Sequence, residues 1–264
     1  MSVTLACDRL GAGPVVVLVH GVGIGPWSYA GMAASLAGDH SVVVPHRRGY
    51  GSSAGPAASL EQQVDDLAGL VDGPAAFVGV SGGATLVLAL ALAHPGLVAA
   101  AVVHEPALGP LAPDLDAELQ AAGAALLAGG EKEALPFVRG LVGGEAWARL
   151  TPERRGDVWA RAATVSHEVP QFLSFAPDAR QLRAAADLAV VTTVGGASRP
   201  SRHRAAATLA AHLGTTPTML AGVGHLAQIE GPVALAAALR QAEALHRRAG
   251  GDQHVLPAGR GDEL

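Results

Sequence analysis

Short apolar stretches alternate with helical patterns along most of this chain of 264 residues, and that alternation constrains the fold more than any other feature. Each stretch is apolar at consecutive positions, which is typical of a strand buried on both faces of a parallel sheet. We therefore predict an α/β protein with a mostly parallel, doubly wound sheet. The predicted strands are Val15–Val19, Ser41–Pro45, Ala75–Val80, Val98–His104 and Leu188–Val194, with Thr216–Ala221 as a weaker sixth and Val3–Cys7 as an edge strand. The predicted helices are Trp27–Ala37, Leu60–Val71, Gly82–His94, Arg202–Leu213 and Val233–Arg248.

The alternation is interrupted from Ala107 to about Asp187, where helical patches are broken by Gly and Pro. We predict that this segment is a helical cap inserted between two strands of the sheet. Residues 1–106 and 188–248 then form the core, residues 107–187 the cap, and the Gly/Asp/Arg-rich residues 249–264 a flexible tail. Aromatic residues concentrate in the cap, where they suit either packing against the core or lining an apolar pocket.

The composition of the chain excludes several classes of protein. Hydrophobic residues make up 50% and charged residues 16%, so a large core can form and a disordered chain is excluded. A net charge of −5 without a basic stripe argues against nucleic acid as a partner. The single cysteine, Cys7, excludes an intrachain disulfide and a Cys-rich zinc site. A homodimer is left open.

Neither a membrane span nor a secretory signal is evident in the sequence. The longest largely apolar run, Gly83–Ala93, is shorter than the ~20 residues that a spanning helix needs. Met1–Cys7 lacks a basic start followed by an apolar run. We therefore expect a cytoplasmic protein with no membrane partner.

The segment Gly79-Val80-Ser81-Gly82-Gly83 follows a predicted strand and opens a predicted helix. This is the setting of a nucleophile elbow, in which a serine occupies a tight strand-to-helix turn. The residues two before and two after the serine must be small because the chains approach closely there, and both are glycine. We predict that Ser81 projects above the carboxyl edge of the sheet as a nucleophile.

A glycine-rich turn, Val19-His20-Gly21-Val22-Gly23, follows an earlier predicted strand. Such a turn can aim a backbone N–H at the reaction centre and, with the N–H of Gly82, form an oxyanion hole with two donors. We favour Val22 as the second donor, with Gly21 as the alternative. His20 is expected to brace the turn.

The same turn also has the spacing GxGxG of a dinucleotide fingerprint, but the last glycine of that fingerprint falls on Pro26. The following strand leads into His46-Arg47-Arg48, which offers no acid for a ribose. Its arginines suit a 2′-phosphate, so NADP stays the weaker alternative. We expect no cofactor, with Arg47 and Arg48 in a structural loop.

A histidine follows the last predicted strand, in Gly222-Val223-Gly224-His225. A histidine at that edge can lean toward Ser81 and act as a general base. The other ten histidines show no metal-ligand spacing such as HxxxH, so no metal site is predicted.

In this order, His20-Gly21, the elbow at Gly79–Gly83 and Gly224-His225 resemble the α/β-hydrolase superfamily over roughly Val15 to Arg248. The resemblance implies Ser81 as nucleophile, His225 as base, and Val22 with Gly82 as the oxyanion hole. It also implies that the predicted insertion is the family's variable cap. The usual first hairpin is shortened here to Val3–Cys7.

A triad also needs a carboxylate to orient the histidine. The family usually places it after the strand that here is Leu188–Val194, but Ser198 occupies that position and no Asp or Glu occurs from Leu188 to Ile229. Glu105 ends the strand that follows the elbow helix, and adjacent strands lie only ~5 Å apart. A minority of the family places its acid there, so we predict Glu105 as the third member.

Other roles for the nearby acids are left open. Glu105 could instead pair with Arg47 or Arg48, or cap the insertion. Glu230 is expected to begin the final helix, and Asp187 lies at the opposite edge of the sheet because it precedes its strand.

Three short segments are similar to fungal zearalenone lactonases: His104-Glu105, the loop at 193–198 without Asp, and Val158-Trp159-Ala160-Arg161. This narrower resemblance implies hydrolysis of a lactone with a Glu as the triad acid. It also implies that Trp159 covers the substrate.

We therefore expect a cofactor-independent serine hydrolase that cleaves an ester or lactone of an apolar small molecule through an acyl-enzyme on Ser81. Because a fold does not fix its chemistry, C–C hydrolysis, perhydrolysis or biosynthetic cyclisation in the same pocket stays open. A non-catalytic binding protein of hydrolase fold is the other alternative, and the intact pair of Ser81 and His225 argues against it.

Overall fold

The computed structural model describes residues 4–53 and 58–252. A seven-stranded sheet lies at its centre, in the order β1-β3-β2-β4-β5-β6-β7. β1 pairs antiparallel with β3, and every other neighbouring pair is parallel. The predicted α/β fold is confirmed. The strands are β1 (Cys7–Leu10), β2 (Val15–Val19), β3 (Ser41–Pro45), β4 (Ala75–Val80), β5 (Val98–His104), β6 (Val190–Gly195) and β7 (Thr218–Leu220).

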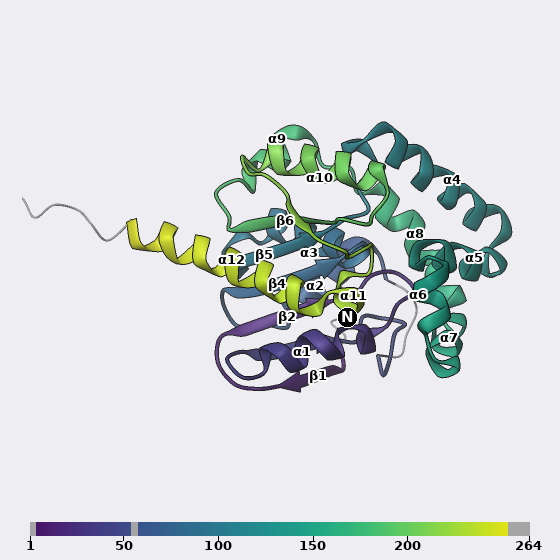
Figure 1. Ribbon diagram of the computed structural model, residues 1–264, viewed down its shortest axis with the longest axis horizontal. Coiled ribbons are helices and arrows are strands. Elements are labelled where there is room, and N and C mark those ends of the chain that lie inside the picture. Colours follow the sequence, from purple (N-terminus) through teal and green to yellow (C-terminus); the bar gives the residue numbers. More distant parts are fainter. Residues whose placement is uncertain (1–3, 54–57, 253–264) are drawn as a thin grey trace, which may run out of the picture.

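Helices cover both faces of the sheet (Figure 1). Alternate strand residues enter two separate apolar clusters: Val17 and Val19 of β2 belong to one, and Val16 and Leu18 to the other. The first cluster is completed by α2 (Leu60–Ala68), α3 (Gly82–Ala93) and α10 (Pro200–His212), and the second by α1 (Ala30–Leu36) and α12 (Pro232–Asp252). Shorter connecting helices are η1 (Pro26–Tyr29), η2 (Pro95–Leu97) and α11 (Ala227–Glu230).

The chain between β5 and β6 is described throughout and forms helices but no strand. In Figure 1 the helices α4 to α8 gather beside one end of the sheet, and we call these five helices the cap. α9 instead contacts α10 and α3 of the core. The elements of this segment are η3 (Gly109–Leu111), α4 (Pro113–Gly129), α5 (Glu131–Val142), α6 (Gly144–Arg149), α7 (Pro152–Trp159), α8 (Ala162–Ser174) and α9 (Ala179–Ala184).

Three sequence predictions differ from the structure. The edge strand is Cys7–Leu10 rather than Val3–Cys7, and its last three residues are exposed, so no apolar pattern marks it; Val3 lies outside the described residues. Glu230 ends α11 instead of beginning the final helix. α12 continues to Asp252, beyond the predicted start of the tail at residue 249, and residues 253–264 lie outside the described part.

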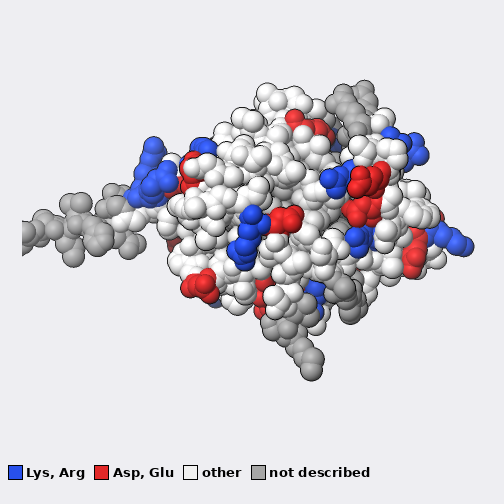
Figure 2. Space-filling model, turned by 90° about the horizontal axis from the view of Figure 1, so that it is seen from below, with Lys and Arg blue, Asp and Glu red and all other residues white. Residues whose placement is uncertain are grey.

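Three further observations concern membrane spanning, metal binding and surface charge. Within the described residues, no helix is both long and apolar enough to cross a membrane, and no group of three or more His, Cys, Asp or Glu side chains is placed to hold a metal ion. Figure 2 shows basic and acidic side chains interspersed among uncharged areas on the face that it presents. The charge on that face is mixed in sign rather than gathered in one patch.

Phe77, in the middle of β4, tests the packing of the first apolar cluster because its ring is fully buried there. Phe77→Ala should lower the free energy of unfolding by about 3–5 kcal/mol, since it leaves a cavity that the surrounding strands cannot close. Urea denaturation measures the change. Leu127→Ala in α4, where the side chain is 73% exposed, is the control and should change stability by less than about 0.5 kcal/mol. Equal losses in the two variants would contradict this packing.

Candidate active site

Ser81 lies at the turn between β4 and α3 with φ 56° and ψ −123°, a backbone conformation that non-glycine residues rarely adopt. Two glycines make the turn possible: a Cβ on Gly79 would clash with the backbone of Gly83, and a Cβ on Gly83 would clash with the carbonyl of Val19. The Ser81 N–H donates to the carbonyl of His104 at the end of β5 (2.9 Å). The predicted serine is therefore held at the carboxyl end of β4, against the next strand.

Glu105 follows β5 directly and has a φ of 46°; Ser81 and Glu105 are the non-glycine residues with positive φ in the described chain. Its side chain is only 2% exposed. One carboxylate oxygen accepts the N–H of Gly195 at the end of β6 (2.9 Å), and the other accepts from Nδ1 of His225 (2.7 Å). The structure thus brings Glu105 and His225 together.

The surroundings of Glu105 favour its ionised form. Burial raises the pKa of the carboxyl, but the hydrogen bond and charge of His225, together with His104, outweigh burial and hold that pKa well below its usual range. An ionised carboxylate only accepts hydrogen bonds, so Nδ1 of His225 carries the hydrogen. The other ring nitrogen, Nε2, is left as the acceptor.

His225 lies in the loop between β7 and α11, and this loop is fixed from two sides. The N–H of Gly224 donates to Glu230 (2.6 Å), and Nε2 of His104 donates to the carbonyl of Gly224 (3.3 Å). Nε2 of His225 is buried and has no hydrogen-bond partner among the described residues. His225 and Ser81 line the same small cavity, although no hydrogen bond joins them in this structure. Catalytic hydrogen bonds of this kind often tighten only in the substrate complex.

The turn after β2 contains Val22 and Gly21, the two residues considered for the second oxyanion donor. The carbonyl of Gly21 accepts from Nδ1 of His20 (3.0 Å) and from the guanidinium of Arg47 (2.9 Å). Because the Gly21–Val22 peptide is trans and planar, the Val22 N–H points the opposite way, away from Arg47. The Val22 nitrogen lies 3.5 Å from the position that a Cβ would occupy on Gly82, whose own N–H belongs to the unpaired first turn of α3. This geometry favours Val22 over Gly21 as the second donor.

Arg47 connects this turn to the cap. Its buried guanidinium forms an ion pair with the buried carboxylate of Glu168 in α8. The hydroxyl of Tyr50 donates to the same carboxylate (2.6 Å) and accepts the N–H of Gly23 (2.8 Å). Neither Arg47 nor Arg48 pairs with Glu105, because Arg48 binds Asp66 of α2 (2.6 Å).

Sequence reasoning missed Glu168. The residue was one more acid in the cap, and its partner Arg47 lies 121 positions earlier in the chain. A signal was present, however: Val165, Glu168, Val169 and Phe172 are the buried residues of α8, so the acid occupies the apolar face of that helix. A charged residue on such a face usually has a buried partner.

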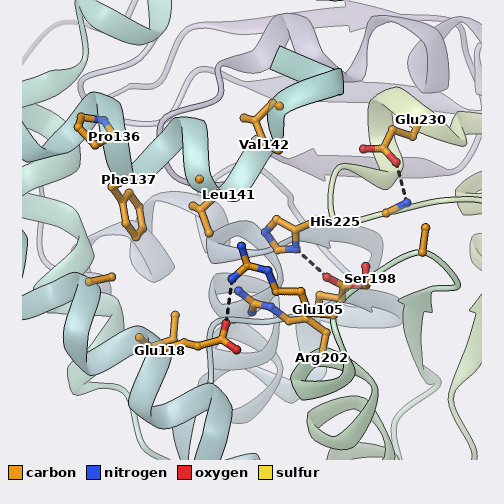
Figure 3. A pocket seen from close by; sticks show the side chains of 18 of the residues that line it. Glu105, Glu118, Pro136, Phe137, Leu141, Val142, Ser198, Arg202, His225 and Glu230 are labelled. Atoms are coloured by element: carbon orange, nitrogen blue, oxygen red, sulfur yellow. Dashed lines mark hydrogen bonds and ion pairs between the residues drawn. The ribbon is translucent and has the colours of Figure 1, made fainter. Parts of the chain in front are cut away.

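Besides the small cavity that Ser81 and His225 share, two further cavities lie between the cap and the carboxyl ends of the strands. The larger, of about 670 Å³, is lined in part by Glu105 and His225, and the smaller, of about 20 Å³, by Ser81 and Gly82. Figure 3 shows Phe137 and Leu141 of α5 on the cap side of the larger cavity and His225, Glu105 and Arg202 on the core side. Four residues line both cavities, which are therefore adjacent: Leu119, Phe137, Leu141 and Arg202.

Trp159, which was expected over the substrate, lies elsewhere. Its side chain is 57% exposed at the end of α7, and it lines neither cavity. The residue that α7 buries is the preceding Val158. Consecutive residues of a helix point in different directions, so burial of Val158 turns Trp159 outward. We therefore remove Trp159 from the candidate site.

His104 had no predicted role of its own, yet it is fully buried beside Glu105. Its Nδ1 accepts from the hydroxyl of Thr193 (3.0 Å), which agrees with a neutral ring that donates through Nε2. Burial lowers the pKa of His104 to about 4, against the opposing attraction of Glu105. His104 is therefore a neutral support between the carboxylate of Glu105 and the histidine loop.

Replacing His104 by Gln should make stability less sensitive to acid. The unfolded chain protonates this histidine near pH 6.5 and the folded chain only near pH 4, so stability is lost as the pH falls through that window. His104 accounts for a loss of about 3 kcal/mol in the free energy of unfolding across this window. Urea unfolding at a series of pH values measures it. His246→Gln, at an exposed position of α12, should keep the wild-type slope, and a parallel slope in His104→Gln would refute the explanation.

Comparison with solved structures shows the same fold. A thermophilic esterase from Thermogutta terrifontis, in a malate-bound structure, has a TM-score of 0.73 and 22% identity, over 92% of this chain and 94% of that chain. Est816, described as an enzyme that degrades N-acyl homoserine lactones, has a TM-score of 0.71 and 22% identity, over 89% of this chain and 95% of that chain. At these identities the likeness concerns the fold alone.

Sequence comparison gives the family. The curated "Uncharacterized hydrolase YraK" of Bacillus subtilis (strain 168) is 35% identical over 106 residues, which span 37% of this chain and 39% of that protein. A family model described as "Alpha/beta hydrolase family" matches residues 16–238, from β2 into α12. Since that match takes in the elbow, the cap and the histidine loop, the chain belongs to the alpha/beta hydrolase family.

Proposed function

We propose that this protein is a cofactor-independent serine hydrolase that cleaves an ester or lactone of an apolar small molecule. One observation carries the proposal. Nδ1 of His225 is bound by the buried carboxylate of Glu105, while Nε2 is buried without a partner in a cavity that Ser81 also lines. A histidine oriented in this way is suited to take a proton from a serine. The folds shared with an esterase and with a lactone-degrading enzyme support the same class.

In the first half of the proposed reaction, Oγ of Ser81 attacks the carbonyl carbon while its proton passes to Nε2 of His225. The carbonyl oxygen becomes an oxyanion and accepts the N–H groups of Val22 and Gly82. The carboxylate of Glu105 stabilises the imidazolium. The bond to the leaving oxygen then breaks, and that oxygen takes the proton from His225 as the acyl group stays on Ser81.

In the second half, water attacks the acyl carbon and gives its proton to His225, which returns it to Oγ of Ser81. The product is a carboxylic acid. With a lactone, the alcohol and the acid stay in one molecule, so the product is a hydroxy acid. The apolar side chains that line both cavities, Leu119, Phe137 and Leu141, are placed to contact the hydrocarbon part of the substrate.

The nucleophile is tested by Ser81→Ala. This variant should fold normally, hydrolyse no p-nitrophenyl butyrate above background and take up no fluorophosphonate probe, because both reactions need the Ser81 hydroxyl. Mass spectrometry of the intact protein measures the labelling. Ser174→Ala, at an exposed position of α8, should react like the wild type. Labelling of Ser81→Ala at the wild-type level would overturn the proposal.

The acid is tested by Glu105→Gln, which keeps the size of the side chain but removes its charge. We expect kcat to fall about 10³- to 10⁴-fold, since a neutral amide neither fixes the tautomer of His225 nor stabilises its charged form. Steady-state kinetics with the same ester measure the loss. Asp187→Asn makes the same chemical change at an exposed residue before β6 and should leave kcat unchanged. A fall smaller than about tenfold in Glu105→Gln would place the acid elsewhere.

A further inference from the structure

Arg202, in the first turn of α10, is a buried cation without a partner among the described residues. Its side chain is 7% exposed, its Nη1 is fully enclosed, and no ion pair or side-chain hydrogen bond of the described residues includes it. Enclosed nitrogens also occur on Arg47 and Arg161, but those guanidinium groups pair with Glu168 and Asp157 through their other nitrogens. Arg202 differs because no residue in the described part of the chain binds any atom of its guanidinium.

The carboxylates closest to Arg202 are already occupied. Glu118 of α4 accepts from Arg199 (3.4 Å) and from the hydroxyl of Ser201 (3.0 Å). Both oxygens of Glu105 are bound by the end of β6 and by the histidine loop. The two acids attract the charge of Arg202 from a distance, while burial lowers the pKa of its guanidinium. That group stays charged, because the ordinary pKa of arginine lies far above neutral pH.

The position of Arg202 relates it to the reaction centre. It is one of the four residues that line both the larger cavity and the small cavity formed by Ser81 and Gly82, and the other three are apolar. Figure 3 shows its guanidinium among the side chains around His225 and Glu105. A buried charge is unfavourable unless an opposite charge or several hydrogen bonds compensate it. A molecule that occupies the larger cavity and reaches Ser81 can supply that compensation.

We propose that Arg202 binds a carboxylate of the substrate, so that the ester or lactone is part of a molecule that also carries an acid group on an apolar chain. This inference rests on the proposed function and names its substrate class. A carboxylate matches the planar fork of a guanidinium. Three glutamates and two arginines line the larger cavity, so a second negative charge on the ligand is repelled. The ligand group is therefore a monocarboxylate rather than a phosphate dianion.

The kinetic test compares monomethyl adipate with methyl adipamate, which replaces the acid by a neutral amide of the same size. The corresponding pairs from succinate and suberate vary the chain length, and kcat/KM is obtained from released methanol. The wild type should prefer the acid about 10- to 100-fold at one length or more, the range for hydrogen bonds to a charged group. Arg202→Met should bring that ratio close to one, and Arg202→Lys should keep part of it because a lysine retains the charge without the fork.

Arg204→Met is the matched control. Arg204 is on the same helix, lines neither cavity and pairs with Asp114, so its loss should leave the ratio at the wild-type value. The proposal is wrong if the wild type shows no preference for the acid at any length. It is also wrong if Arg202→Met lowers kcat/KM by the same factor for both esters, because that result would mean that Arg202 only balances the charge of Glu105. If Arg202→Met does not fold, Arg202→Lys decides instead. A smaller preference for the acid in that variant supports the proposal, and an equal loss of kcat/KM for both esters contradicts it.

A binding measurement separates this inference from the proposed function. Calorimetry with Ser81→Ala compares the affinities for monomethyl adipate and methyl adipamate without turnover. Tighter binding of the acid, lost in the double variant with Arg202→Met, supports the role of Arg202 even if the wild type hydrolyses neither ester. Equal affinities overturn that role, whereas absence of fluorophosphonate labelling in the wild type overturns the proposed function alone.

Discussion

The contact between the carboxylate of Glu105 and Nδ1 of His225 joins the end of β5 to the loop that follows β7, and the candidate site is arranged around it. Parallel strands end at one edge of a sheet, so β4, β5 and β6 deliver Ser81, Glu105 and Gly195 to the same place. A buried carboxylate is stable there only if its oxygens are bonded. The N–H of Gly195 and the ring of His225 satisfy both oxygens, and the same bonds fix which nitrogen of the ring faces the cavity.

The parts of the fold that the sequence predicts well are those that are buried on both faces. β2, β3, β4 and β5 have the predicted bounds because each is a short, valine-rich or alanine-rich apolar run of five to seven residues, a length typical of a buried strand. The bounds of β1 were predicted wrongly, at Val3–Cys7 instead of Cys7–Leu10, because it is a short edge strand with an exposed surface, so its composition resembles that of a loop. The elbow was predictable for a different reason: close approach of the chains permits only glycine at positions 79 and 83, and this steric requirement is visible in the sequence.

The pairing of Glu105 with His225 was predictable from the family resemblance together with elimination, because no other acid follows a strand at the right edge. The contacts of the cap were not predictable, since they depend on how helices are rotated against the core. Trp159 faces outward and Val158 inward, although either could have been the buried residue of α7. The isolation of Arg202 depends on the geometry of its neighbours, because the nearest acids have other partners. A sequence lists the charges but does not show which of them are paired.

The cap is attached to the core by two kinds of contact that differ in strength. At α8, Glu168 and Arg47 are both buried, and separating them leaves two charges without partners in an apolar environment. At α4, Asp114 pairs with Arg204 of α10 and Glu118 with Arg199 just before that helix, near the surface, where water and salt weaken an ion pair. Arg47 also binds the carbonyl of Gly21, so the buried attachment holds the turn after β2 as well as α8. The side of the cap that adjoins this turn is thus held by a buried ion pair, whereas the side that adjoins Arg202 and the larger cavity is held by exposed ion pairs.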